Sequence, residues 1–191
     1  MSIPLKKQSY TYEDYCTWDD DKRWELIDGI AYAMSPAPSL RHQGISMNLS
    51  RIFSNYLIGK KCKVYASPID VILNPKDKAD TVVQPDLIIV CDSSKLDGKK
   101  ACKGAPDMVV EILSPSTSKK DRIKKLKKYK DAGVREYWII DPEATSIEVL
   151  ILRYSETTDI FYSINVYDEN EMIPVSIFDD LEISFNEIFA E

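Results

Sequence analysis

Two carboxylic acids in the sequence lie inside strongly apolar segments, and a lysine-rich helical segment follows the second. Asp86 stands in the segment 82–90 and Glu111 in the segment 107–113, both composed mainly of Val, Ile, Leu and Met. A carboxylate removed from water is costly unless a cation or hydrogen-bond donors compensate its charge. The pattern therefore predicts two strands whose acids have a partner, and a metal ion is one such partner.

The segment after Glu111 predicts a helix between two strands. The helix is expected from about Ser118 to Ala132, with Gly133 as its end, and the second strand from Glu136 to Asp141. A strand, a helix and a strand of these lengths form a right-handed crossover between parallel strands. We therefore expect the strand of Glu111 and the strand 136–141 to run in parallel.

Local signals predict the remaining elements. A short helix follows Thr11 as its N-cap, an Asp28-Gly29 turn joins two short strands, and Gly59 ends a helix that begins at Leu40. Further strands are expected at 63–73 with a bend at Pro68, 147–152, 161–167 and 173–177, with a loop at 92–106 and a tail helix at 185–189.

Two titratable side chains in these elements allow a structural interpretation as well as a functional one. Glu25 directly precedes the tight turn, and by residue type alone it is an exposed strand glutamate. His42, the single histidine, falls in the first turn of the helix from Leu40. A histidine there is more often a helix-end or surface group than a general base, because geometry must come before pKa in naming a base.

Length and apolar content predict one domain. The chain has 191 residues and 44% of them are apolar, so residues 1–191 can form a single core. No run of about 18 apolar residues marks a membrane helix, and the segment 1–7 lacks the apolar centre of a signal peptide. We expect a soluble, cytoplasmic protein with no membrane partner.

Cysteine usage predicts neither a disulfide scaffold nor a zinc site. The spacing of the four cysteines shows no CxxC motif, and a single histidine gives zinc too few ligands. We therefore expect reduced, mostly buried thiols at all four positions. These are Cys16, Cys62, Cys91 and Cys102.

Positive charge is concentrated around the predicted acids, although the whole chain carries −6. The segment 95–130 holds twelve Lys and Arg against four Asp and Glu, a local charge of +8, and the rest of the chain carries −14. This asymmetry suits a phosphate-bearing substrate such as DNA. The alternative is a solvated surface helix, and the sequence leaves both interpretations open.

Asp86 and Glu111 are predicted to bind a divalent metal ion. Hydrolysis of a phosphodiester requires a hard cation, a positioned water and a positive group near the charge that develops in the transition state. Magnesium binds one or two carboxylates together with waters and substrate oxygens. The two acids and a main-chain carbonyl such as that of Ile112 would therefore suffice for Mg²⁺ (or Mn²⁺).

One lysine of the predicted helix is expected to complete this site. A step of about 100° per residue predicts a buried face formed by Ile123, Leu126, Tyr129 and Ala132. Lys125 is the lysine nearest to that face, and it shares a side of the helix with Asp121, four residues before it. Lys124 and Lys128 are close competitors.

Several motifs occur in a fixed order along the chain. They are WELIDG at 24–29, MSPAP at 34–38, HQ at 42–43, QPD at 84–86, VEILSPST at 110–117, Asp121 with Lys125 and Tyr129, and GVREYWIIDP at 133–142. In this order they resemble the Uma2-like (DUF820) family of restriction endonuclease homologues, within the PD-(D/E)xK nuclease superfamily. Each motif alone is common, whereas their combined order is specific and covers most of the chain to about Asp141.

The resemblance implies an α+β (α/β) fold with a restriction endonuclease-like core, a mixed central sheet flanked by helices. It also implies a homodimer. By the same resemblance, the site residues are Asp86, Glu111, Lys125, Glu25 and Gln84.

Each of these residues has an implied role. Asp86 and Glu111 would bind the metal, and Glu25 with Gln84 would line the site. Lys125 would orient or activate the water and stabilise the transition state. The lysine that the superfamily pattern places two residues after the second acid is replaced by a leucine at position 113, so this role must have moved to the helix.

The sequence is compatible with three functions. A magnesium-dependent DNA endonuclease predicts metal-dependent cleavage that requires the two acids and the lysine. A catalytically inactive nucleic-acid-binding module of the same fold predicts salt-dependent binding through 95–130 without turnover. A structural or interaction protein predicts neither metal nor DNA binding.

Overall fold

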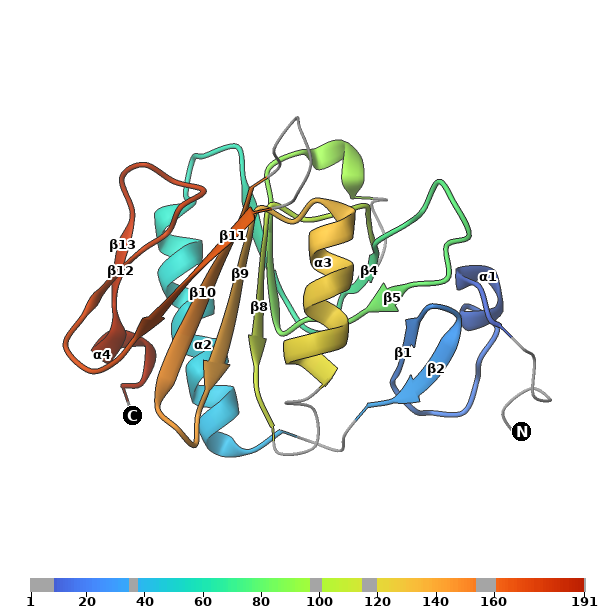
Figure 1. The fold of residues 1–191 in the computed structure, drawn as a ribbon, viewed down its shortest axis with the longest axis horizontal. Helices are drawn as coiled ribbons and strands as arrows, with labels where there is room; N and C mark the ends of the chain where they lie inside the picture. Colours follow the sequence, from blue (N-terminus) through green and yellow to red (C-terminus); the bar gives the residue numbers. More distant parts are fainter. Residues whose placement is uncertain (1–8, 35–37, 97–100, 115–119, 154–160, 191) are drawn as a thin grey trace.

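The computed structural model describes residues 9–34, 38–96, 101–114, 120–153 and 161–190, without the side chains of 120, 121, 152, 153, 161 and 162 (Figure 1). Its helices are α1 (Tyr12–Tyr15), α2 (Leu40–Tyr56), a 3-10 turn (Ser93–Lys95), a π-helix (Lys120–Lys125), α3 (Leu126–Ala132) and α4 (Phe185–Ile188). Its strands are β1 (Trp24–Ile27), β2 (Ile30–Ala33), β3 (Lys63–Ala66), β4 (Asp70–Ile72), β5 (Val82–Val83), β6 (Leu87–Val90), β7 (Ala101–Lys103), β8 (Met108–Ile112), β9 (Glu136–Asp141), β10 (Ser146–Arg153), β11 (Phe161–Tyr167), β12 (Met172–Pro174) and β13 (Glu182–Ser184). Within these ranges, no helix combines the length and the apolar content that a bilayer span requires.

A six-stranded mixed sheet forms the centre of the fold, in the order β11-β10-β9-β8-β6-β3. Strands β8 and β9 are parallel, with Val110 paired to Trp138, and the other neighbours are antiparallel. The π-helix and α3 connect β8 to β9. The predicted parallel connection between the strand of Glu111 and the strand 136–141 is therefore confirmed.

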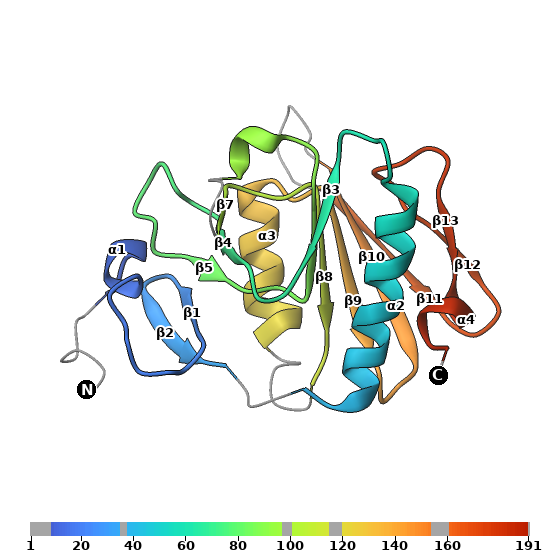
Figure 2. The same cartoon turned by 180° about the vertical axis from the view of Figure 1, so that it is seen from behind.

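Alternating apolar residues cover both faces of this sheet. Met108, Val110 and Ile112 of β8 face a core formed with α2, which lies on the side seen in Figure 2. Val109, between them, faces a second core that includes Tyr129 of α3, on the side seen in Figure 1. Successive side chains of a strand point to opposite faces, so a strand apolar at every position is buried on both sides.

A second sheet, in the order β2-β1-β5-β4-β7, lies beside the first and carries Glu25 on β1. Its β1–β2 hairpin has the predicted turn, with φ of 53° at Asp28 and 73° at Gly29. Both values suit a tight hairpin turn, which requires positive φ at its two central residues. A Cβ at Gly29 would lie 1.9 Å from Ser9 Oγ, so glycine is also required by space.

The predicted cap at Thr11 and the predicted stop at Gly133 are present, Ser39 supplies a further N-cap, and α2 ends at Tyr56, before the predicted stop at Gly59. The Thr11 side chain and Asp14 form a reciprocal capping box at the start of α1. Ser39 Oγ caps α2 by accepting a hydrogen bond from the backbone N–H of His42 at 3.2 Å. Gly133 ends α3 with a left-handed φ of 94°.

Two predicted strands are in fact divided at prolines. The segment 63–73 becomes β3 and β4 on either side of Pro68, and the segment 82–90 becomes β5 and β6 on either side of Pro85. The members of each pair belong to different sheets, because proline supplies no N–H to continue a ladder. The predicted loop 92–106 also contains β7, which pairs in parallel with β4.

The expectation of four reduced thiols is wrong for two of them. Cys62 and Cys91 form a disulfide. They stand just outside the paired ends of β3 and β6, where Lys63 pairs with Val90, so the antiparallel register brings them opposite each other. Their separation of 29 residues gives no recognisable spacing signal. Cys16 is an exposed thiol and Cys102 a buried one.

Candidate active site

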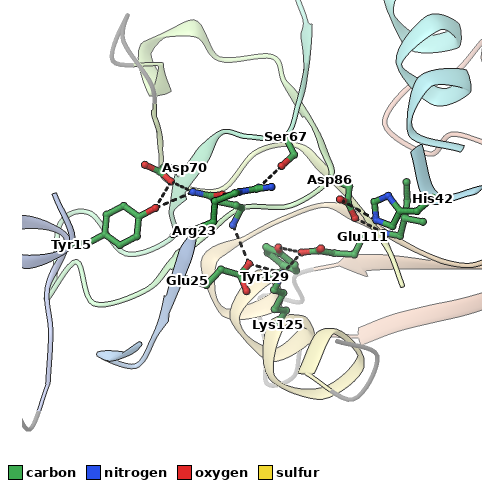
Figure 3. Close-up of polar contacts among 12 residues, drawn as sticks. Tyr15, Arg23, Glu25, His42, Ser67, Asp70, Asp86, Glu111, Lys125 and Tyr129 are labelled. Carbon is green, nitrogen blue, oxygen red and sulfur yellow. Dashed lines mark hydrogen bonds and ion pairs between the residues drawn. The ribbon is translucent and has the colours of Figure 1, made fainter. Parts of the chain in front are cut away.

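Asp86 and Glu111 meet across neighbouring antiparallel strands (Figure 3). Leu87 at the start of β6 pairs with Val110 of β8, and one further step in this register sets Asp86 opposite Glu111. Asp86 Oδ2 accepts a hydrogen bond from the backbone N–H of Ile112 at 2.7 Å, which fixes its carboxylate against β8. The structure thus places the two predicted acids side by side.

Lys125 lies between two buried glutamates. Its Nζ is 2.7 Å from Glu25 Oε1 and 2.8 Å from Glu111 Oε1, and only 3% of its side chain is exposed. Glu25 Oε1 also accepts a hydrogen bond from the backbone N–H of Gln84 at 3.1 Å. One amine therefore compensates two carboxylates that come from different sheets.

The helix that carries Lys125 begins with a π-helical turn. Residues Lys120–Lys125 form i to i+5 hydrogen bonds before α3 continues as an α-helix. The wider turn shifts the phase of the helix, so that Ile123, predicted to be buried, is 60% exposed while Lys125 is buried. The prediction of Ile123 on the buried face is therefore wrong, because it assumed 3.6 residues per turn throughout.

Tyr129 fixes Glu111 from the next turn of the helix. Its hydroxyl donates to Glu111 Oε1 at 2.6 Å, and its ring packs on Tyr137 with 5.0 Å between centroids. Burial raises the pKa of Tyr129 well above its usual value, and the negative charge of Glu111 raises it further. The phenol therefore remains a proton donor to the carboxylate.

His42 lies beside Asp86 although its sequence position gave little reason to expect it there. Its Nε2 is 3.4 Å from Asp86 Oδ1, and the Ser39 cap holds the first turn of α2 at this end of the sheet. Burial alone would lower the pKa of His42. The hydrogen bond to Asp86, its negative charge and the main-chain carbonyl of Ile112 together outweigh burial and raise it.

The donor set fits a hard divalent cation that keeps several of its waters. Asp86, Glu111 and the Ile112 carbonyl, which lies near His42, supply oxygen ligands of the kind that magnesium prefers. Among the residues that the structure describes, no group of three or more His, Cys, Asp or Glu side chains is placed to hold a metal. The two acids and the carbonyl would therefore leave the remaining positions of a divalent cation to water and substrate oxygens.

Gln84 connects this cluster to a group of polar residues at its edge. Besides its backbone bond to Glu25, its side chain accepts from Arg23 Nε at 2.9 Å and donates to Asp70 Oδ1 at 2.8 Å and to Tyr15 OH at 2.9 Å. Figure 3 shows these residues on the side of Glu25 away from Glu111. Gln84 thus lines the site and also positions its neighbours.

Comparison with known proteins places this architecture in a family. A family model described as "Uma2: Putative restriction endonuclease" matches residues 11–186. The chain belongs to the Uma2 family. The protein slr1290 of Synechocystis sp. is 31% identical over 162 residues, which cover 83% of this chain and 80% of that protein.

A solved structure supports the fold. A crystal structure from Anabaena variabilis, described as "a putative nuclease belonging to DUF820", superposes with a TM-score of 0.72 at 21% identity and covers 94% of this chain and 97% of its own. The predicted α+β fold with a mixed sheet and flanking helices is confirmed.

Part of the positive charge counted in 95–130 is engaged by other side chains of this Uma2 chain. Lys127 lies 2.9 Å from Asp131 Oδ2, and Lys124 donates to Tyr32 OH at 2.8 Å. Further pairs of the described residues are Lys128 with Asp28 and Arg122 with Glu148 and Asp141. Lys99 and Lys100, and the side chain of Asp121, lie outside the part that the structure describes. The counted charge therefore overstates the open positive surface.

The sequence interpretation missed Arg23, Tyr15 and Asp70 and undervalued His42. A weak signal was available for two of these residues. Arg23 precedes Glu25 by two positions and therefore lies on the same side of an extended chain. His42 lies four positions after Pro38, in the first turn of the helix predicted from Leu40. Tyr15 and Asp70 carried no such signal, because their contact joins residues 55 positions apart.

Proposed function

We propose that this Uma2 protein is a metal-dependent endonuclease that hydrolyses phosphodiester bonds of DNA. The observation that carries the proposal is the Lys125 amine, buried between Glu25 and Glu111, with Asp86 at the strand position opposite Glu111. Buried ion clusters contribute little net stability, since desolvation offsets their attraction. A lysine with two acids in an otherwise apolar sheet is therefore better explained by chemistry than by folding.

Asp86, Glu111 and the main-chain carbonyl of Ile112 would hold Mg²⁺ or Mn²⁺. When bound, such an ion polarises a phosphoryl oxygen and lowers the pKa of a bound water. Neighbouring groups of the chain hold the two carboxylates in position. Ile112 N–H anchors Asp86, and Tyr129 OH anchors Glu111. This preorganisation removes the cost of arranging the carboxylates during the reaction.

Lys125 would orient the attacking water and stabilise the negative charge that develops on the phosphoryl group. Its two carboxylate neighbours favour the charged form of the amine. Glu25 holds the amine at 2.7 Å, and Gln84 N–H holds Glu25 in turn. Attack of water forms one phosphorus–oxygen bond and breaks the bond to the leaving sugar oxygen. The amine contributes most where it meets charge present only in the transition state.

Cleavage by purified protein tests this proposal. Supercoiled plasmid, linear duplex and single-stranded DNA are incubated with Mg²⁺, Mn²⁺ or EDTA. We expect cleavage with metal and none with EDTA, and at least a hundredfold loss in Asp86→Ala, Glu111→Ala and Lys125→Ala. Lys127→Ala, an exposed lysine of the same helix, is the matched control, and circular dichroism verifies folding of each variant. Activity that survives both acid substitutions would overturn the proposal.

One observation favours a second candidate, a nucleic-acid-binding module without catalysis. The Lys125 amine is already engaged by two carboxylates, and no described cluster of three ligating side chains surrounds a metal position. This candidate predicts DNA binding that weakens with salt but no cleavage with any metal. Retained DNA affinity in Glu111→Ala, together with an inert wild type, would select it.

We also propose that the protein acts as a homodimer, as the family resemblance implies. A two-fold symmetric dimer would present two copies of the site, one for each strand of a duplex. Light scattering after size-exclusion chromatography measures the mass directly. A monomeric mass at the concentrations used for cleavage would refute the dimer without affecting the nuclease proposal.

A further inference from the structure

Arg23 is an exposed arginine held in a fixed orientation at the edge of the candidate site (Figure 3). Its Nε donates to Gln84 Oε1 at 2.9 Å and its Nη2 donates to Ser67 Oγ at 2.7 Å. Both acceptors are neutral. Within the described part of the chain, its Nη1 forms no hydrogen bond and no carboxylate pairs with the guanidinium. A full positive charge therefore remains available to an external anion.

The group behind Arg23 fixes which end of the Gln84 amide faces it. Gln84 Nε2 donates to Asp70 Oδ1 at 2.8 Å and to Tyr15 OH at 2.9 Å, and Tyr15 OH donates to the same Asp70 oxygen at 2.9 Å. A carboxylate only accepts hydrogen bonds, so the amide NH₂ must face Asp70 and its oxygen must face Arg23. The guanidinium is thus oriented before any ligand arrives, which reduces the entropy lost on binding.

Arg23 is also coupled to the acids of the site through short connections. The backbone N–H of Gln84 donates to Glu25 Oε1 at 3.1 Å, and that oxygen lies 2.7 Å from Lys125 Nζ. The backbone N–H of Met34 bonds to the carbonyl of Arg23, which extends the β1–β2 pairing to this residue. Arg23 therefore stands two positions before Glu25 on the same side of the extended chain.

Binding of an anionic substrate requires a positive charge such as that of Arg23 at the edge of the candidate site. Glu25, Asp86 and Glu111 outnumber the Lys125 amine, so the acids repel a phosphate group unless further positive charge is present. A metal ion would compensate the acids at the centre but not along the flanking strand of the substrate. Arginine is well suited to this task because its planar fork matches phosphate oxygens.

We infer that Arg23 binds a backbone phosphate next to the scissile phosphodiester, and that Gln84 and Ser67 position its guanidinium for that contact. The inference rests on the proposed nuclease function and names one subsite of the same site. The ligand is a nucleic-acid phosphate diester, recognised by charge and geometry and not by base sequence.

Binding of labelled DNA to paired variants tests the inference. The probes are a fluorescein-labelled 20-base-pair duplex and its single strand, with Ca²⁺ as the hard cation, and the readout is fluorescence anisotropy over a range of salt concentrations. Arg23→Gln is expected to weaken binding roughly tenfold and to lower the salt slope by about 0.9 on duplex or about 0.7 on single strand. Arg51→Gln removes the same charge from an exposed position of α2 and is the matched control, with a smaller loss expected.

Methylphosphonate substitution distinguishes phosphate contact from a merely structural role. Neutralising one phosphate at a time should weaken wild-type binding most at a single position, and this loss should vanish in Arg23→Gln but persist in Arg51→Gln. Arg23→Lys keeps the charge but not the fork, so it should recover only part of the affinity. Wild-type-like thermal midpoints verify that the variants are folded.

The outcomes separate this inference from the proposed function. If wild type binds the probes and Arg23→Gln binds them equally well, or if every methylphosphonate affects both proteins alike, the inference is refuted while the nuclease proposal stands. If wild type binds neither duplex nor single strand, the proposed function falls and the inference falls with it.

Discussion

Two buried glutamates on neighbouring strands differ in the groups that compensate their burial. Glu111 on β8 faces the α3 side of the six-stranded sheet, where Lys125 and Tyr129 contact it. Glu136 on β9 faces the α2 side, fully buried, and accepts from Trp138 Nε1 at 2.7 Å and from the backbone N–H of Ile177 at 3.0 Å. Among the residues that the structure describes, an amine lies within contact distance of Glu111 but not of Glu136.

The difference shows that a cation, and not burial by itself, distinguishes the candidate site. Burial raises the pKa of Glu136, although its hydrogen bonds and the charge of Arg135 partly oppose this shift. A buried acid can therefore be held by neutral hydrogen-bond donors without an amine in contact. At Glu111 the Lys125 amine provides a charge that neutral donors cannot supply.

Among the changes at these two glutamates, removal of Lys125 should lower the free energy of unfolding most. Lys125→Met leaves Glu25 and Glu111 buried without a cation, and losing one partner of a buried ion cluster typically costs about 3–5 kcal/mol. Urea unfolding measures the loss. Lys127→Met, which removes an exposed lysine two residues further along, should leave the unfolding midpoint unchanged. Equal midpoints for wild type and Lys125→Met would show that the amine is not needed to hold the two acids.

Removing the Tyr129 hydroxyl should have an intermediate effect. Tyr129→Phe deletes one hydrogen bond to a charged acceptor, worth about 1.5–3 kcal/mol, but leaves Lys125 in contact with Glu111. We expect reduced unfolding free energy together with slower cleavage, because Glu111 loses one of its anchors. An unchanged stability would mean that Lys125 alone orients this carboxylate.

The smallest effect is expected at Glu136, and it depends on pH. Since the folded-state pKa of Glu136 is raised above its usual 4.5, its contribution to stability is fully present below that value and is lost as pH rises through the folded pKa. Glu136→Gln removes this titration at a cost of below about 1 kcal/mol. The difference in unfolding free energy, wild type minus variant, should therefore fall as pH increases above about 4.5. A difference that rises with pH would contradict the shift.

Local patterns in the sequence were sufficient for much of the fold. The Asp28-Gly29 turn, the Thr11 cap and the Gly133 stop were predictable because each depends on the backbone conformations allowed within a few residues. The strand around Glu111 was predictable because it is apolar at nearly every position. The predicted site set, Asp86 and Glu111 with Lys125, rested on the same local reasoning combined with family resemblance.

Other features were decided only by the tertiary structure. The π-helical turn at Lys120–Lys125 and the exposure of Ile123 were not predictable from periodicity, which places Ile123 on the buried face. The Cys62–Cys91 disulfide depends on the register of β3 with β6.

The contacts around the candidate site were also decided by the tertiary structure. Glu25 of the second sheet reaches Lys125 of the helix that follows β8, and Arg23 reaches Gln84, 61 positions further along the chain. The sequence by itself determined which charged residues lie within apolar strands, because residue type and local periodicity can be recognised in short segments. Strand order and register determined which of those charges meet, because such contacts join residues far apart along the chain.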